Sequence, residues 1–424
     1  MRTDPSQKPW FRILVLVYSC IFLCLGFLVR FHFARADDCY WRAPDSYISI
    51  AGNLAQGRGF VDNQSNFGVP DSTRRPPLVP FVLSIFFRCS GKIDSLAGFF
   101  VFQSLIGAIT ALLVALLGWK LSNSLGVYLF LVPVYSFWAP AMGLAPCVMT
   151  ETTFIFLFCS ACLVLVEAFR KVSWTYFAAA GLLVGLASLA RPILYPLYFL
   201  LAAAWPWLFA KKAKVSAKQK GIAAALFFAA LLAVIFPWIQ RNTNINGRFT
   251  LITSSVGLNL VMENSPASRP QMWIQLQEEA APGGELSEID ETTRDWRLLD
   301  RAFGFIRQDP GRFAGQMIDR LIHVFNNSND NFPELRFNVQ WSTKWVFFLV
   351  IGLVVLFSTS FSQGLLMLLF ELNFIAVYCL TFFEARFRET VMPVHLVLAC
   401  IGGAYIIRKI CEYRKRRLSL KRGA

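Results

Sequence analysis

The polar stretch 37–80 follows the first apolar run and holds side chains that could bind and activate a charged substrate. A pair of arginines, Arg74 and Arg75, directly precedes the proline pair Pro76–Pro77. Arginines bind a phosphate through two parallel hydrogen bonds, and a carboxylate can take a proton from a hydroxyl or an amine. Such groups gathered beside membrane segments indicate a functional site. The stretch also contains three acids: Asp37, Asp38 and Asp45.

Charged residues in later turns of the chain are expected at the same membrane level. Glu151 opens the apolar run 151–158, where an acid is costly unless it faces a polar cavity. Arg191 precedes Pro192 in a tight turn between two apolar runs. Arginines and carboxylates at the lipid–water boundary suit a sugar carried on a lipid phosphate, with its tail in the bilayer. The full set expected on this face is Asp45, Arg74, Arg75, Glu151, Arg191, Arg241, Glu384, Arg386 and Arg388.

Each of these residues also has a simpler interpretation. An arginine at the end of a membrane span often only anchors at lipid headgroups. An acid such as Glu151 at the start of a helix is stabilised by the helix dipole alone. Asp45, which precedes Ser46, suits the N-cap of a surface helix. The convergence of several carboxylates and arginines on one face is what favours a functional site.

The composition is that of a helical protein that crosses a membrane several times. Of its 424 residues, 56% are hydrophobic, and the mean hydropathy is +0.50. The net charge is +15, but the basic clusters Lys211–Lys220 and Arg408–Arg422 lie beside expected spans, a pattern of cytoplasmic loops rather than of nucleic-acid binding. Cys159 and Cys162 lie in a Phe- and Leu-rich run without a second ligand pair, so we interpret them as packing residues. Gly57–Arg58–Gly59 is too short for a nucleotide-binding loop.

The apolar runs predict an all-α membrane protein with ten spans and one helix that enters the membrane only in part. The apolar core of Leu78–Phe87 has about ten residues, too few to cross a bilayer at ~1.5 Å per residue. Treating this segment as an interfacial or re-entrant helix places Lys120, Arg170 with Lys171, and both termini in the cytoplasm, as the positive-inside rule requires. The charged set then lies outside. The expected spans are 11–29, 95–119, 123–141, 152–169, 174–190, 192–210, 221–239, 345–359, 363–383 and 390–407.

The spans divide the chain into four parts. In the extracytoplasmic loop 30–94, residues 45–56 have the spacing of an amphipathic helix at the membrane surface. Residues 240–341 hold half of the acids of the chain, and we expect them to form a helical cap. One helix should end before Asp309–Pro310–Gly311, and an amphipathic helix should end near Phe325. The parts are a transmembrane catalytic module (1–239), an extracytoplasmic cap (240–341), C-terminal spans (342–407) and a basic cytoplasmic tail (408–424).

A set of segments, taken in order, resembles the GT-C glycosyltransferases of the protein-O-mannosyltransferase and aminoarabinose-transferase type (glycosyltransferase family 39-like). The resemblance implies a GT-C-like fold in a bacterial inner or plasma membrane. It also implies inverting transfer of a hexose or pentose from a polyprenyl-phosphate donor to a glycolipid, polysaccharide or protein. The segments are PDSYISIAGNLAQGRGF with RRPPLVPF, MTETTFIFLF, LARPILYPL, PWIQRNTNINGRF with SSVGLNLVMENSP, AFGFIRQDPGRF and EARFRETVMP.

The resemblance also implies roles for individual residues. Asp45 corresponds to the base that takes the acceptor proton, with Asp37 and Asp38 as alternatives because the family spaces this aspartate further from the tyrosine at position 47. Arg75 corresponds to the residue that contacts the donor phosphate, and Glu151 to a second carboxylate of the active site. The other residues expected there are Arg74, Arg191 and Arg386 on the phosphate, and Tyr47 and Arg241 on the substrate.

The expected chemistry requires no cofactor, because a single displacement needs one base and a phosphate leaving group. Some GT-C relatives use a divalent ion, but His32, His323 and His395 are scattered and form no metal-binding pattern. Two other functions use the same residues. A transporter or flippase of lipid-linked sugars would bind the phosphate without breaking a bond, although the sequence shows no inverted repeat. A glycolipid assembly protein would bind the lipid without catalysis.

Overall fold

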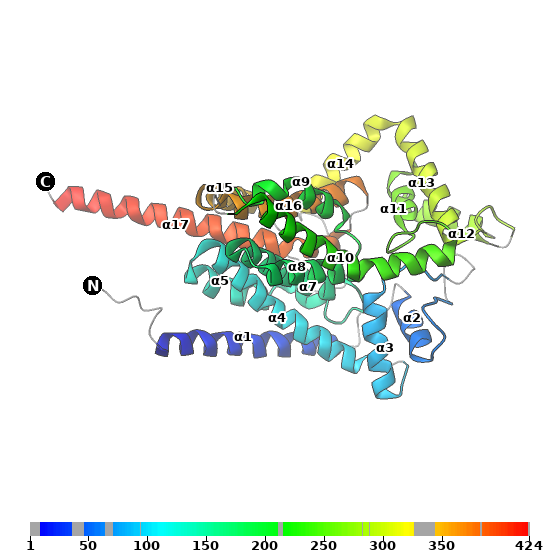
Figure 1. Ribbon diagram of the computed structural model, residues 1–424, viewed down its shortest axis with the longest axis horizontal. Helices are drawn as coiled ribbons and strands as arrows, with labels where there is room; N and C mark the ends of the chain where they lie inside the picture. The colour runs from blue at the N-terminus through cyan, green and yellow to red at the C-terminus, as the bar shows by residue number, and fades with distance from the viewer. Residues whose placement is uncertain are drawn as a thin grey trace.

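Helices make up the architecture of the described chain. They form a bundle with a smaller group of helices at one end (Figure 1). No strand occurs within the described residues, where the only pairing of this kind is an isolated antiparallel bridge between Asp62 and Asp71. The computed structural model describes residues 9–35, 46–63, 71–93, 95–210, 215–281, 283–287, 289–325, 344–381 and 384–422.

Six helices of the described chain are long and apolar enough to cross a membrane, which makes the chain an integral membrane protein. The remaining expected spans coincide with shorter helices: α5 (Leu125–Ser136), α8 (Trp174–Ala190), α9 (Tyr195–Leu208) and α15 (Lys344–Thr359). The all-α class is therefore confirmed, while the count of ten spans stays a prediction. The six long helices are α1 (Pro9–Arg35), α4 (Ala97–Ser122), α7 (Glu151–Lys171), α10 (Ala217–Asn246), α16 (Phe361–Leu380) and α17 (Met392–Arg422).

Helices are present at both segments where the sequence analysis expected a surface helix and a half-inserted helix, while their depth in the membrane stays a prediction. The amphipathic segment forms α2 (Tyr47–Ala55), which buries Ile50 and Leu54. The short apolar segment forms α3 (Leu78–Ser90), whose 13 residues span only about 20 Å. Figure 1 shows α3 running crosswise to α1 and α4, so α3 does not cross the bundle with them. Pro77 occupies the N-cap of α3, where a missing N–H group costs nothing.

The cap is helical and has its own small core. It consists of α11 (Val256–Asn264), α12 (Arg269–Ala280), α13 (Glu291–Gln308) and α14 (Pro310–Phe325). Its core includes Val261, Met272, Leu276 and Leu298. Asp290 begins α13 by accepting a hydrogen bond from the Thr293 N–H at 2.9 Å, and α13 ends one residue before Asp309, as predicted.

The two ends of the bundle differ (Figure 1). The cap, α2 and α3 gather at one end, which we call the cap end. The start of α1 and the end of α17 lie at the other end, which we call the tail end, and α17 extends beyond the rest of the bundle there. Helix α7 runs between the cap end and the tail end. It begins at Glu151 and ends at Lys171, and its 21 residues correspond to a rise of about 30 Å.

Glycines allow two helices of the bundle, α15 and α17, to pack closely against each other. At α15 and α17, a Cβ atom on Gly352 would lie 1.9 Å from the Leu398 carbonyl oxygen, and one on Gly402 would lie 2.0 Å from that of Phe348. Only glycine permits the two backbones to approach this closely, as is common between membrane helices. Cys159 and Cys162 are buried in α7, as expected of packing residues.

Candidate active site

The candidate active site lies at the cap end of α7, where one buried acid meets two arginines. Glu151 is the first residue of α7, and its side chain is 1% exposed. Arg191 Nη1 donates to Glu151 Oε1 at 2.8 Å, and Arg386 Nε lies 3.7 Å from the same oxygen. The two guanidinium groups bring to one place several N–H donors of the kind that bind a phosphate. The sequence analysis predicted that these three residues would share one face, and the structure brings them together.

Local sequence explains the position of Arg191. It is the C-cap of α8 and has an extended backbone, with φ −151° and ψ 115°. The following Pro192 enforces this conformation, because its ring excludes helical geometry at the preceding residue. The chain therefore turns at Arg191 and directs its guanidinium over the ring of Phe387, 4.0 Å from the ring centroid. Cation–π contact and the ion pair hold the same group from two sides.

Arg386 comes from η2 (Ala385–Thr390), the 3-10 helix between α16 and α17. Its Nε atom also lies 2.6 Å from Glu384 Oε2, and its Nη1 donates to Met149 Sδ at 2.9 Å. Arg386 therefore connects η2 to the loop that precedes Glu151. Its side chain is 20% exposed, so it retains contact with solvent at the edge of the site.

A second buried acid in η2, Glu389, was not expected from the sequence. It is 3% exposed and accepts a hydrogen bond from Trp138 Nε1 at 2.7 Å. Burial raises the pKa of Glu389 to about 7, against the opposing effects of this hydrogen bond and of Arg388. Arg388 itself donates to the His323 carbonyl oxygen of α14 at 2.7 Å, which joins η2 to the cap. The only feature of the sequence that could have pointed to Glu389 is its position as the second acid of the segment EARFRETVMP.

Arg75 lies beside the start of α2 and packs on an aromatic ring. Its guanidinium carbon is 5.7 Å from the ring centroid of Tyr47. Tyr47 is buried in a cluster with Ala145 and Val148, which belong to the segment leading into α7. Arg75 therefore packs on Tyr47, which shares a hydrophobic cluster with the segment that precedes Glu151.

Arg74 and Arg241 hold the first loop in shape. Arg74 Nε lies 2.8 Å from Asp71 Oδ2, and Arg294 of the cap lies 3.5 Å from the other oxygen of Asp71. Arg241 donates to the carbonyl oxygens of Phe60 and Ser72 at 3.2 and 3.0 Å. These contacts give both arginines a structural role, and their expected contacts with donor phosphate and substrate stay predictions.

Cap and first loop are joined by a carboxylate as well. Glu291, the first residue of α13, accepts hydrogen bonds from the backbone N–H of Thr73 at 2.9 Å and from its hydroxyl at 2.8 Å. The N–H of Ser72 donates to the other oxygen of the same carboxylate. The residues just before Arg75 are thus fixed to the cap.

Other predicted residues lie outside this group. Asp37, Asp38 and Asp45 fall outside the described residues, so the identity of the base stays a prediction. The described histidines are separate: His32 lies on α1, His323 on α14, and His395 on α17 within 2.8 Å of Glu371 Oε2. Among the described residues, no three His, Cys, Asp or Glu side chains are grouped as a metal site would require.

Comparison with solved structures defines the class of fold. The Archaeoglobus fulgidus oligosaccharyltransferase tethered with an acceptor peptide superposes with a TM-score of 0.54 at 13% identity, covering 96% of this chain and 51% of that one. AglB from the same organism, in complex with an inhibitory peptide and a dolichol-phosphate, gives 0.55 at 13% identity, covering 98% and 52%. The chain thus spans about half the length of these proteins. It has the fold of the GT-C glycosyltransferases.

A family comparison narrows this class. Residues 74–239 match the sequence model of the dolichyl-phosphate-mannose-protein mannosyltransferases. The matched segment contains Arg75, Glu151 and Arg191, while Arg386 lies beyond it. Together with the fold, this match confirms the resemblance to GT-C glycosyltransferases of the protein-O-mannosyltransferase type. No curated protein matches the chain by sequence.

Proposed function

We propose that the chain transfers a hexose or pentose, with inversion, from a polyprenyl-phosphate donor to an extracytoplasmic glycolipid, polysaccharide or protein. The observation that carries this proposal is the buried Glu151 held by Arg191 and Arg386 at the cap end of a membrane helix. A lipid-phosphate donor would place its tail along the bundle and its phosphate among these arginines. A donor of this chemistry is supported by the name of the matched family, which includes dolichyl-phosphate-mannose, and by the structure of AglB in complex with a dolichol-phosphate.

The residues have distinct proposed roles in the displacement. Arg75, Arg191 and Arg386 bind the donor phosphate and stabilise the charge that it gains as it leaves. Asp45, or alternatively Asp37 or Asp38, accepts the proton of the acceptor group. The acceptor atom then forms a bond with the anomeric carbon on the face opposite the phosphate, and the bond between this carbon and the phosphate oxygen breaks. Glu151 orients the two arginines that surround it.

The proposed orientation follows from charge. Lys120, Arg170 and Lys171 lie at the tail end of the bundle, which we therefore place in the cytoplasm together with both termini. The candidate active site then faces the extracytoplasmic side of a bacterial inner or plasma membrane. Lipid-linked sugars presented on that side would reach the site from the bilayer.

The test is transfer of radiolabelled sugar from synthetic polyprenyl-phosphate donors by purified protein, with lipid and protein extracts as acceptors. Wild type should move the label, whereas Asp45→Asn and Glu151→Gln should each lose transfer at unchanged helical content. Glu278→Gln, an exposed acid of α12, is the matched control and should transfer normally. Full activity of Glu151→Gln and of all three first-loop aspartate variants would refute the mechanism. Intact donor that appears on the opposite leaflet would instead identify a transporter.

A further inference from the structure

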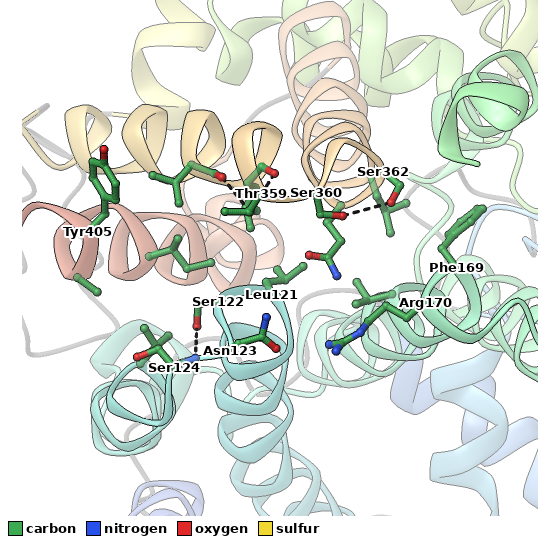
Figure 2. A pocket seen from close by; sticks show the side chains of 18 of the residues that line it. Leu121, Ser122, Asn123, Ser124, Phe169, Arg170, Thr359, Ser360, Ser362 and Tyr405 are labelled. Atoms are coloured by element: carbon green, nitrogen blue, oxygen red, sulfur yellow. Dashed lines mark hydrogen bonds between the residues drawn. The ribbon is translucent and has the colours of Figure 1, made fainter. Parts of the chain in front are cut away.

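A cavity of about 560 Å³ lies at the tail end of the bundle, remote from the candidate active site. It is enclosed by the turn between α4 and α5, the last turn of α7, the turn between α15 and α16, and α17 (Figure 2). Arg170 of this cavity and Glu151 stand on the same helix, nineteen residues apart, which corresponds to about 28 Å along the axis. The two sites therefore lie on opposite faces of the membrane.

The charged groups that line this cavity are both cationic. Arg170 and Arg408 enter it from α7 and α17, and none of its lining residues is acidic. Glu167 and Glu412 are the nearest acids to these arginines, each at 3.9 Å and each outside the lining. Lys120 and Lys171 also surround Glu167, at 3.1 and 3.4 Å, so positive charge exceeds negative charge at this end of α7. Such an environment favours an anionic ligand.

Hydrogen-bond donors surround the same space. Ser124 and Ser360 are the N-cap residues of α5 and α16, and neither side chain makes the usual capping hydrogen bond. The Ser360 hydroxyl instead lies 3.4 Å from that of Ser362, and both residues line the cavity. Figure 2 shows Asn123 and Arg170 on one side of the cavity and Ser360 with Ser362 across from them. The arginines, hydroxyls and amides come from four separate elements of the fold.

The remaining wall of the cavity is apolar and belongs to membrane helices. Leu121, Val166, Leu356 and Ile401 all contribute to it. A free inorganic anion would leave these side chains without a partner, whereas the glycerol and upper acyl carbons of a lipid would cover them. The volume lies within the range of about 300–1,000 Å³ typical of small-molecule sites, which is large enough for a phosphate headgroup with its glycerol.

The exit of α17 beside the cavity favours a negatively charged lipid. Residues 408–422 of this helix carry eight Lys or Arg side chains and one acid, Glu412. Exposed Ile407 and Ile410 on the same helix add apolar surface next to these charges. A polybasic, partly apolar helix at the edge of a membrane concentrates anionic lipids around it.

From these observations we infer that the tail-end cavity is a binding site for an anionic phospholipid, with its phosphate on Arg170 and Arg408. The bound headgroup would join α4, α7, α16 and α17 at the face opposite the candidate active site. This inference does not depend on the proposed transferase activity, because no residue of the cavity belongs to the candidate active site.

The experiment measures lipid binding to the 424-residue protein by native mass spectrometry, with titration of phosphatidylglycerol against phosphatidylcholine. Wild type should retain phosphatidylglycerol selectively. The double variant Arg170→Gln/Arg408→Gln should raise the apparent Kd at least about tenfold, since each lost charge-assisted hydrogen bond accounts for roughly that factor. The matched double variant Lys409→Gln/Arg416→Gln removes the same charge from the exposed tail and should bind nearly as wild type does.

A second variant tests the cavity without changing charge. Ala404→Phe fills the space from α17 and should weaken phosphatidylglycerol binding while all arginines remain. It also covers the case in which the arginine variant fails to fold. Equal loss in the tail variant, or full binding by Ala404→Phe, would overturn the cavity as the site. Displacement of the lipid by millimolar inorganic phosphate, with no preference between the two phospholipids, would overturn the assignment to a lipid.

Discussion

The ion pair between Glu151 and Arg191 gives the sharpest test of the candidate active site. The two atoms are 2.8 Å apart, and the side chains are 1% and 11% exposed. Removing one partner of a buried pair costs about 3–5 kcal/mol, and a hydrogen bond to a charged group contributes about 1.5–3 kcal/mol. The second arginine, Arg386, has its Nε atom 3.7 Å from Glu151 Oε1 and a side chain that is 20% exposed, so water can still solvate it. We therefore expect a cost at the lower end of these ranges. Glu151→Gln should therefore lower the free energy of unfolding by about 2–3 kcal/mol.

The assay is a double-mutant cycle with Glu151→Gln, Arg191→Gln and their combination, measured by reversible unfolding in mixed micelles. The coupling energy should be about 1–3 kcal/mol. Each single variant leaves the other member of the ion pair buried without its partner, whereas the double variant removes both charges. The control cycle uses Glu279→Gln and Arg301→Gln, a pair that is also 2.8 Å apart but has side chains that are 16% and 29% exposed. Its coupling should stay below about 1 kcal/mol. Additive effects of Glu151→Gln and Arg191→Gln, within about 0.5 kcal/mol, would refute the reasoning.

Three further predictions concern η2, the cap and the helix contacts. The pKa of Glu389 is raised from 4.5 to about 7, so its burial costs no stability below pH 4.5 and a growing amount as the pH rises through 7. Glu389→Gln should abolish this part of the pH dependence of thermal unfolding. An unchanged pH profile would contradict the prediction. Glu291→Gln should speed amide hydrogen exchange at Ser72 and Thr73, whose N–H groups it holds, and the exposed control Glu285→Gln should not. Gly402→Ala should cost about 1–3 kcal/mol through overpacking, whereas Gly403→Ala, where the nearest atom would be 3.9 Å away, should be neutral or stabilising, and equal effects would refute the close contact.

Much of the architecture could be predicted from local patterns. Apolar runs located α4, α7 and α16, and the short apolar core after Pro77 located α3 as a short helix. A proline fixed the turn at Arg191 and another fixed the boundary between α13 and α14. In these cases the cause lies within a few residues, so the sequence alone carries the information.

The partners of buried charges could not be predicted in the same way. Glu389 meets Trp138 across 251 positions, and Arg241 meets the Ser72 carbonyl across 169. Periodicity indicates which side of a helix is buried, but it does not say which distant group lies opposite. For the same reason, the sequence analysis placed Arg74 on this face but did not predict its ion pair with Asp71. The tail-end cavity arises from four elements, and no single segment predicts it.

The contact between the cap and the first loop connects α13 to Arg75. Arg74 belongs to the ion cluster shared with Arg294 of the cap, and Arg75 packs on Tyr47 beside the segment that leads to Glu151. Adjacent Cα atoms are about 3.8 Å apart, so a shift of α13 passes directly into Arg75 through a single peptide unit. If a ligand that moves the cap changes the affinity for a ligand on Arg75, thermodynamic reciprocity requires the reverse effect to be equally large. The two adjacent arginines thus provide a short connection between the cap and the site proposed for the donor phosphate, without a long pathway between them.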